Sequence, residues 1–297
     1  MSAGRKQVYT IPPGVAFVDA LAAELLREHA GDPLALSRIA VLLPTRRAVR
    51  SLREAFLRLS AGKALLLPRM TPLGDIDEEA LAFAAEEVLL AGAALDIPPA
   101  IPELRRRLLL AELIRKLGEH GIAQAVELAA ELGRLIDQVA TERIGFERLA
   151  SLVPERYAEH WQITLAFLGI VTEHWPKVLE AESAVDPATR RNRLIEAQAA
   201  LWRRQPPDHP VIAAGSTGSI PATADLLALV ATLPTGRVVL PGLDRHTEDE
   251  AWQMLEPSHP QFGLRQLLAH IGVTRQEVMD WPSGGFAASP PARAVLM

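Results

Sequence analysis

The sequence predicts an α/β protein in which a parallel sheet is interrupted by a large all-helical insertion. Short apolar, β-branched runs alternate with helical segments at both ends of the chain, and turn residues separate them. Between about Asp75 and Arg204 the apolar residues instead recur with the 3.6-residue period of helices. Residues 1–74 and 205–297 are therefore expected to form one doubly wound domain, and residues 75–204 a helical domain inserted into it.

In the first segment, each strand prediction rests on an apolar run and each helix prediction on apolar residues at helical spacing. Pro12-Pro13-Gly14 stops the first strand, and Pro44-Thr45 opens the second helix. The expected order is a strand at Gln7–Ile11, a helix at Val15–Ala30, a strand at Ile39–Leu43, an arginine-rich helix at Arg46–Leu59 and a strand at Ala64–Leu67.

The pattern of the middle segment predicts helices alone, and that of the last segment predicts strands and helices again. Pro176 is expected to end or kink its helix, and Asp186-Pro187 to start another that runs to Arg204. The expected helices are Glu78–Leu95, Pro102–His120, Ala123–Thr141 and Glu155–Ala184, followed by a strand at Val211–Ala214, a helix at Pro221–Leu233 capped by Ser219 and a strand at Arg237–Leu240.

Composition excludes several classes of protein. The chain of 297 residues is 49% hydrophobic and 23% charged, which is enough apolar material for a folded core rather than disorder. It has no cysteine, so disulfides, thiolate metal sites and cysteine catalysis are excluded. No signal peptide and no apolar run long enough to cross a membrane is apparent, so we expect a cytoplasmic protein without membrane contact.

Charge is distributed unevenly along the chain. The formal net charge of −5 divides into +6 for residues 1–69, −11 for residues 70–189 and 0 for residues 190–297. A surface that faces phosphates is therefore expected in the first segment. The predicted insertion, residues 75–204, carries −7 and is better suited to a basic protein partner than to DNA.

Motifs for common chemistry are missing. The pattern G-x-x-x-x-G-K-[ST] of a phosphate-binding loop is absent, and none of the four lysines follows the turn after the first strand at the right spacing. No pair of histidines has metal-ligand spacing, and there is no G-x-S-x-G nucleophile motif. We thus expect no catalytic residue, metal or cofactor. The GSTGS loop, residues 215–219, is interpreted as a tight turn with a helix cap rather than an anion cradle, since no basic residue accompanies it.

Two groups of arginines are candidates for binding phosphate. Arg46 and Arg47 follow Thr45 at the end of a predicted strand, and Arg50, Arg53 and Arg58 continue the series. Thr45, Arg46 and Arg47 form the hypothetical DNA contact, and a solvated basic face is the alternative. Arg105-Arg106-Arg107 are interpreted as ion-pairing residues of the acidic helical domain. Trp161 and Trp175 are assigned to its core rather than to base stacking.

Several longer strings resemble one protein family. They are IAVLLPTRRA (39–48), HWQITLAFLGIV (160–171), DPATRRNRL (186–194), PVIAAGSTGSIPATADLL (210–227), VVLPGLD (238–244) and HPQFGLRQLL (259–268). Together they resemble the N-terminal region of the AddB family of double-strand break repair subunits, in its α-proteobacterial form. The resemblance covers essentially the whole chain. Members of that family are several times longer and end in a nuclease domain, so the chain resembles an N-terminal fragment.

The resemblance implies a RecA-like fold, similar to domain 1A of superfamily 1 helicases, with a helical 1B-like insertion. Pro12, Pro13 and Gly14 fall where the phosphate loop belongs, and Ala214 and Gly215 where the Walker B acids belong. The chain has neither the lysine nor the acids at these degenerate nucleotide-site positions.

The resemblance further implies that Pro44-Thr45-Arg46 meets the single-strand backbone. An inactivated helicase module of this family would serve DNA handling and scaffolding in recombination, with ATP hydrolysis left to the AddA subunit. The degenerate helicase part of the family is also associated with recognition of a recombination hotspot sequence.

Two other functions remain open. One is a protein interaction module without DNA contact, and the other, which the missing lysine and acids disfavour, is an active NTPase. For the helical insertion we expect packing against AddA or against later parts of an AddB chain. The alternative is that it guides DNA through Arg105–Arg107.

Overall fold

The computed structural model describes residues 6–32, 34–74, 97–117, 121–146 and 169–282. The chain divides into two compact units, one formed by residues 1–90 with 198–297 and the other by residues 91–197. These limits differ from the predicted insertion, 75–204, at both ends. The second unit begins only at residue 91, and it ends at residue 197 because the last turns of the helix Pro187–Arg204 belong to the first unit.

The first unit is built on a six-stranded, all-parallel sheet to which both ends of the chain contribute. Its strands stand in the order β3-β2-β4-β5-β1-β6. This confirms the α/β class and the prediction that the two α/β segments share one sheet. The strands are β1 (Val8–Ile11), β2 (Ala40–Leu43), β3 (Arg69–Pro72), β4 (Val211–Ala214), β5 (Gly236–Pro241) and β6 (Met279–Asp280).

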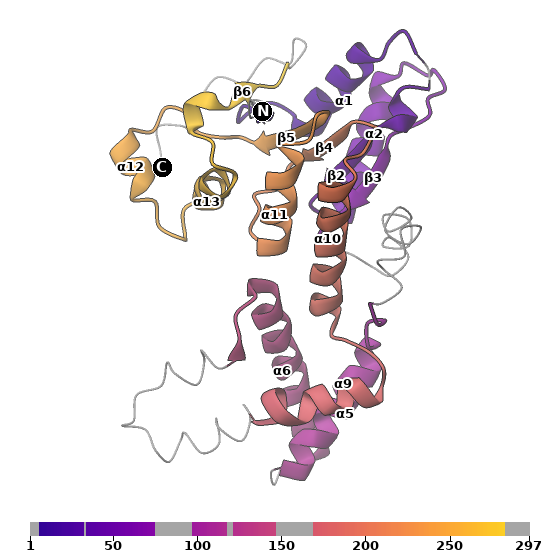
Figure 1. Cartoon of the computed structure of the whole chain (residues 1–297), viewed down its shortest axis with the longest axis vertical. Helices are drawn as coiled ribbons and strands as arrows, with labels where there is room; N and C mark the ends of the chain where they lie inside the picture. Colours follow the sequence, from indigo (N-terminus) through magenta and orange to yellow (C-terminus); the bar gives the residue numbers. More distant parts are fainter. Residues whose placement is uncertain (1–5, 33, 75–96, 118–120, 147–168, 283–297) are drawn as a thin grey trace. The chain divides into compact units, whose positions relative to one another are not determined.

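Helices cover both faces of this sheet (Figure 1). Helices α1 (Phe17–Glu28) and α2 (Arg46–Leu59) pack together on one face, and α11 (Pro221–Val230) and α13 (Phe262–Ile271) on the other. Right-handed crossovers produce this division, because the chain moves along the sheet in opposite directions after β2 and after β4. The short elements are η1 (Leu36–Arg38), α12 (Asp249–Gln253) and η3 (Arg275–Glu277).

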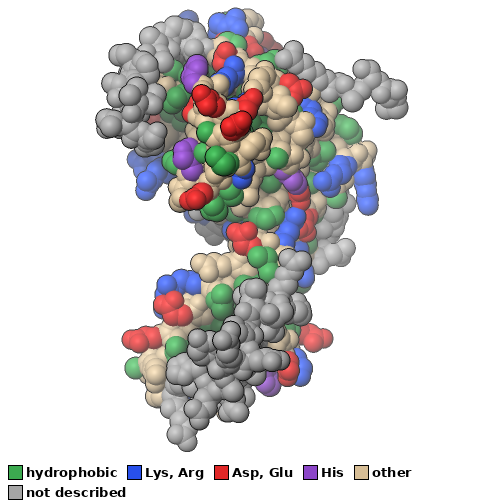
Figure 2. All heavy atoms as spheres, turned by 90° about the vertical axis from the view of Figure 1, so that its left-hand side faces the viewer, with side chains coloured by type: hydrophobic (Ala, Val, Ile, Leu, Met, Phe, Trp, Pro, Cys, Tyr) green, Lys and Arg blue, Asp and Glu red, His purple; other side chains and the backbone are tan. Residues whose placement is uncertain are grey.

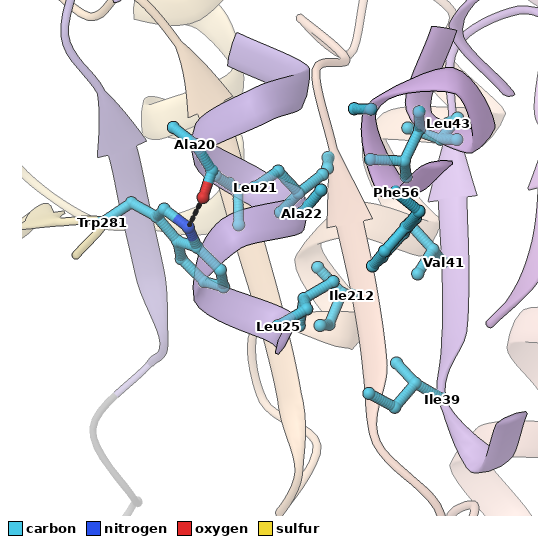
Figure 3. Packing of buried hydrophobic residues seen from close by; sticks show 14 of the residues in the cluster. Ala20, Leu21, Ala22, Leu25, Ile39, Val41, Leu43, Phe56, Ile212 and Trp281 are labelled. Atoms are coloured by element: carbon cyan, nitrogen blue, oxygen red, sulfur yellow. Dashed lines mark hydrogen bonds between the residues drawn. The ribbon is translucent and has the colours of Figure 1, made fainter. Parts of the chain in front are cut away.

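The core beneath α1 and α2 is apolar and fully buried (Figure 3). Leu21 and Leu25 of α1 and Phe56 of α2 are each 0% exposed and pack against the sheet residues Val41 and Ile212. Burial of each such side chain stabilises the fold by roughly 1.5–3 kcal/mol.

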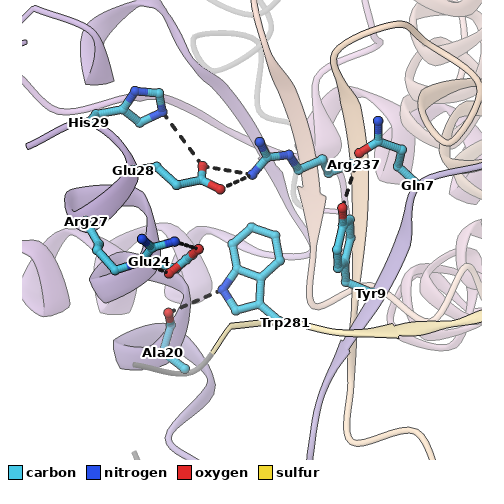
Figure 4. A network of polar contacts seen from close by, with 9 residues as sticks. All are labelled: Gln7, Tyr9, Ala20, Glu24, Arg27, Glu28, His29, Arg237 and Trp281. Carbon is cyan, nitrogen blue, oxygen red and sulfur yellow. Dashed lines mark hydrogen bonds and ion pairs between the residues drawn. The ribbon is translucent and has the colours of Figure 1, made fainter. Parts of the chain in front are cut away.

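A polar network anchors the last strand to α1 (Figure 4). Trp281, which directly follows β6, donates its indole N–H to the carbonyl of Ala20 at 3.3 Å and meets the Tyr9 ring edge-on at 5.4 Å. The Arg237 guanidinium lies 5.9 Å from the Trp281 ring and donates to both carboxylate oxygens of Glu28 at 2.8 Å. Residues from β1, β5 and β6 are thereby tied to a single helix.

The third strand is not where the sequence predicts it. Residues 64–67 have no regular structure, and β3 begins only after Pro68, at Arg69. Leu65 and Leu67 pack against the core cluster from this irregular segment, which explains why the run is apolar. Among the described residues the actual strand pairs only with β2, at the edge of the sheet, and its sequence is therefore more polar.

The second unit is helical. Its described helices are α5 (Glu103–Leu117), α6 (Ile122–Glu142), the π-helical turn η2 (Ile170–His174), α9 (Trp175–Ala181) and the first part of α10 (Pro187–Arg204). The predictions for α5, α6 and α10 are confirmed within a few residues. The predicted helix Glu78–Leu95 and most of Glu155–Ala184, with Trp161, lie outside the described residues.

Pro176 does not end its helix, because the chain continues from a π-helical turn into α9. It stands at the start of α9, directly after the π-helical turn. Proline has no N–H to donate and its ring crowds the preceding turn, so the chain widens there instead of continuing as a regular α-helix.

Candidate nucleic-acid interface

The loops that follow β1, β2, β4 and β5 meet at one edge of the sheet. In a parallel sheet all carboxyl ends lie at the same edge, where ligands of α/β proteins commonly bind. A Cβ added to Gly215, after β4, would lie 3.3 Å from the Phe17 ring and 3.7 Å from Pro44 Cδ. A Cβ on Gly242, after β5, would lie 3.7 Å from Pro13 Cα. The predicted site residues of the three segments are thus brought together.

Strands β2 and β4 flank a point where the connections diverge. β2 leads into α2 on one face of the sheet and β4 leads towards α11 on the other. Such a switch point leaves a crevice above two neighbouring strand ends. Thr45 follows one of these ends and Gly215 the other.

The start of α2 is suited to an anion. Thr45 is the N-cap in an extended conformation, and its hydroxyl accepts a hydrogen bond from the Ala48 amide at 3.1 Å. Arg46 and Arg47 are exposed in the first turn, which holds no acidic residue. Two guanidinium groups beside the positive end of a helix favour the binding of phosphate, and the Thr45 hydroxyl retains its proton for donation.

The start of α1 is different, although the family resemblance places the phosphate loop there. Pro12 to Gly14 form a turn in which the Val15 amide donates to the Pro12 carbonyl at 3.3 Å, and Gly14 has a φ of 87°. No side chain caps α1, and its first residue is Phe17, whose ring packs towards Gly215.

A carboxylate stands in the first turn of α1. Asp19 occupies this position and forms an ion pair with Arg58 of α2. Its negative charge opposes an anion at this helix end.

The loop after β4 has a structural explanation at each glycine. Ala214 is buried, and the Gly215 amide donates to Val239 of β5 at 2.9 Å. Gly215 has a φ of 76°, and a Cβ on Gly218 would come within 2.7 Å of Leu267. The predicted cap is wrong, because Ile220 is the N-cap of α11 and Ser219 makes no capping bond. Proline at the first position of α11 sets the helical φ there without one.

Sequence reasoning missed Asp244, which organises the loop after β5. Its carboxylate accepts hydrogen bonds from the amides of His246 at 2.7 Å and Thr247 at 3.1 Å and from the Thr247 hydroxyl at 2.5 Å. Burial raises the pKa of Asp244, but these hydrogen bonds outweigh burial and hold the pKa below its usual value. The spacing Asp-x-x-Thr, typical of local side-chain turns, was the available signal.

Gln261 ties this loop to the start of α13. Its side chain accepts from the Asp244 amide at 3.1 Å and donates to the Gly242 carbonyl at 2.9 Å. Nothing in the sequence near Gln261 points to residues 17 positions earlier in the chain.

The sequence predicts ion pairing for the arginine run of the helical unit, and two of its three members form ion pairs. Arg105 makes a bidentate pair with Glu182 at 2.7 and 3.1 Å. Arg106 is buried, donates to both oxygens of Asp137 at 2.9 and 3.0 Å, and lies 2.9 Å from Asp186. Arg107 is exposed.

Burial lowers the pKa of Arg106, but the Asp137 hydrogen bond and the Asp186 charge outweigh burial and raise it above its ordinary value. Trp175 is 2% exposed and donates to Asp186 at 3.0 Å, which confirms its place in the core.

The residues that the structure describes form neither a metal-binding cluster nor a membrane-spanning helix. In that part of the chain no three His, Asp or Glu side chains stand close enough together to hold a metal ion. None of the helices described there combines the length and apolar character needed to cross a membrane. Among known proteins, no family model matches the chain, and no curated protein matches it significantly.

Proposed function

We propose that the chain is a non-hydrolysing, helicase-like module that handles single-stranded DNA in double-strand break repair, as the N-terminal region of an AddB-type subunit. The observation that carries this proposal is the start of α2. There a capping threonine and two exposed arginines stand above the switch point of a parallel sheet. The all-parallel sheet, with a helical unit inserted between β3 and β4, is compatible with a RecA-like domain.

The degenerate nucleotide site supports a role without hydrolysis. A Mg-nucleotide needs a lysine for its β- and γ-phosphates and a carboxylate for its metal. The β1–α1 turn offers prolines and glycine at Pro12, Pro13 and Gly14, and β4 ends in Ala214 and Gly215. On this proposal the chain has no nucleotide cofactor, and the AddA subunit supplies the ATPase.

The test is the salt dependence of binding to a fluorescent (dT)20 oligonucleotide, followed by anisotropy. Each phosphate contact to a single strand adds about 0.7 to the slope of log affinity on log salt. The double variant R46A/R47A should reduce the slope by roughly one to two units and weaken binding equally for all sequences.

R203A/R204A is the matched control, because this variant removes two adjacent exposed arginines from the end of α10. It should leave the slope nearly unchanged. An unchanged slope in a folded R46A/R47A protein would assign these arginines to solvent instead of DNA.

A protein partner for the helical unit is the second candidate, which the charge of −7 over residues 75–204 favours. AddA, or a later part of an AddB chain, is the partner on this proposal. Crosslinks from Lys116 and Lys177 in a reconstituted complex should reach that partner. Crosslinks confined to this chain, together with protection of the helices by DNA, would contradict it.

A further inference from the structure

The outer face of α2 carries a line of arginines. Successive residues of an α-helix are rotated by about 100°, so Arg46, Arg50 and Arg53 fall within a sector of roughly 60°. These three residues are named the α2 stripe. They are exposed, whereas Leu52 and Phe56, which lie outside this sector, are fully buried. With a rise of 1.5 Å per residue the stripe is about 10 Å long.

Helix α2 itself contributes a single carboxylate beside this face. Glu54 is the one acidic residue of α2, and its carboxylate lies 3.1 Å from Arg50 Nε, with the two side chains 52% and 83% exposed. Arg53 has no ion pair within the described part of the chain. Asp19 engages Arg58, which lies to the side of the stripe.

We propose that the α2 stripe extends the interface beyond Thr45–Arg47, so that a single strand of DNA follows the outer face of α2, and that Glu54 weakens this contact. This inference rests on the proposed function and names the path of the strand. Phosphates of one stacked strand are 3.4 Å apart along its axis and further apart when the strand is extended. Three guanidinium groups spread over about 10 Å can therefore reach two or three successive phosphates.

Glu54 makes the inference testable by a gain of affinity. Exposed i,i+4 ion pairs stabilise a helix only slightly, so removal of the carboxylate leaves the fold intact. It also frees Arg50 and removes a negative charge beside the strand. The affinity of E54Q for (dT)20 should rise roughly twofold to fivefold at low salt.

R53A is the complementary variant, which should bind (dT)20 more weakly. The slope of log affinity on log salt should fall by about 0.7, and R53K should restore it because a lysine still neutralises a phosphate. E131Q is the matched control for E54Q. It removes an exposed glutamate 2.6 Å from Arg134 on α6 and changes the net charge equally. E131Q should leave the affinity unchanged.

The outcomes separate this inference from the proposed function. A lower slope for R53A together with a higher affinity for E54Q supports the path along α2. An unchanged slope for R53A, or an equal gain for E131Q, overturns that path. If R46A/R47A alone lowers the slope, the proposed function stands and the strand leaves the protein at the start of α2. Equal affinity for poly-glutamate of matched length would overturn the choice of nucleic acid as the ligand.

Discussion

Three consecutive arginines show how strongly burial decides what a charge does. Arg106 is 2% exposed between two carboxylates, whereas Arg105 pairs with Glu182 at the surface and Arg107 is exposed. A buried charge that loses its partner is left without solvation, but a surface pair exchanges its contact for water at little cost.

Alanine substitutions in this run should therefore differ in their effect on the free energy of unfolding. We expect R106A to cost about 3–5 kcal/mol, because Asp186 is left buried and uncompensated. R105A should cost less than about 1 kcal/mol and R107A less than about 0.5 kcal/mol. Urea unfolding followed by tryptophan fluorescence measures all three, and equal losses would refute the ordering.

Asp244 should make stability depend on pH. Because the pKa of Asp244 is lowered in the folded chain, its contribution is present above the unfolded pKa of about 3.9 and is lost as the pH falls through the folded value. The stability difference between the wild type and D244A should thus be constant at neutral pH and shrink in acid. Urea midpoints between pH 7 and pH 3 measure it. A difference that grows in acid would contradict this assignment.

At the scale of elements, Gly215 joins three of them. It follows β4 and lies between Phe17 of α1 and Pro44, which precedes α2, and its φ of 76° disfavours any side chain. We expect G215A to destabilise the chain by about 2–3 kcal/mol, since backbone strain and crowding both act there. G31A is the control, because nothing lies within 4 Å of a Cβ at Gly31. Comparable losses for both variants in urea unfolding would disprove the contact.

The sequence predicts best the elements whose burial is simplest. Strands β1, β2, β4 and β5 lie inside the sheet, and their sequences are mostly apolar and rich in β-branched residues. The edge strand β3 lacks such a pattern, because one of its sides lies at the edge of the sheet. The run before it is apolar because its leucines contact the core from a segment without regular structure. The short strand β6 pairs through only two residues, too few to form a pattern.

The candidate site could be predicted only in part. Thr45, Arg46 and Arg47 are adjacent in sequence and begin a helix, so a local pattern identifies them. The contact of Phe17 with Gly215 joins residues far apart in sequence, and a local pattern carries no trace of it.

At the scale of the whole chain, we expect neither ATP hydrolysis nor a need for magnesium in folding. Asp19 stands in the first turn of α1, and its negative charge opposes a phosphate at that helix end. A ligand at 100 times its Kd raises the free energy of unfolding by about 2.7 kcal/mol, which a thermal shift detects. Mg-ATP should produce no shift and no phosphate release. Turnover by the pure chain would overturn this prediction.

The order of strands also sets the time at which the sheet can form during synthesis. β1 pairs only with β5 and β6, so Thr10 meets its neighbour Leu240 across 230 residues of chain. A ribosome that adds 5–20 residues per second needs roughly 10–50 s to cover that distance. Throughout this interval β1 has no partner in the sheet, and its apolar residues depend on other protection from aggregation. A nascent chain that stops before β5 leaves β1 without either neighbour.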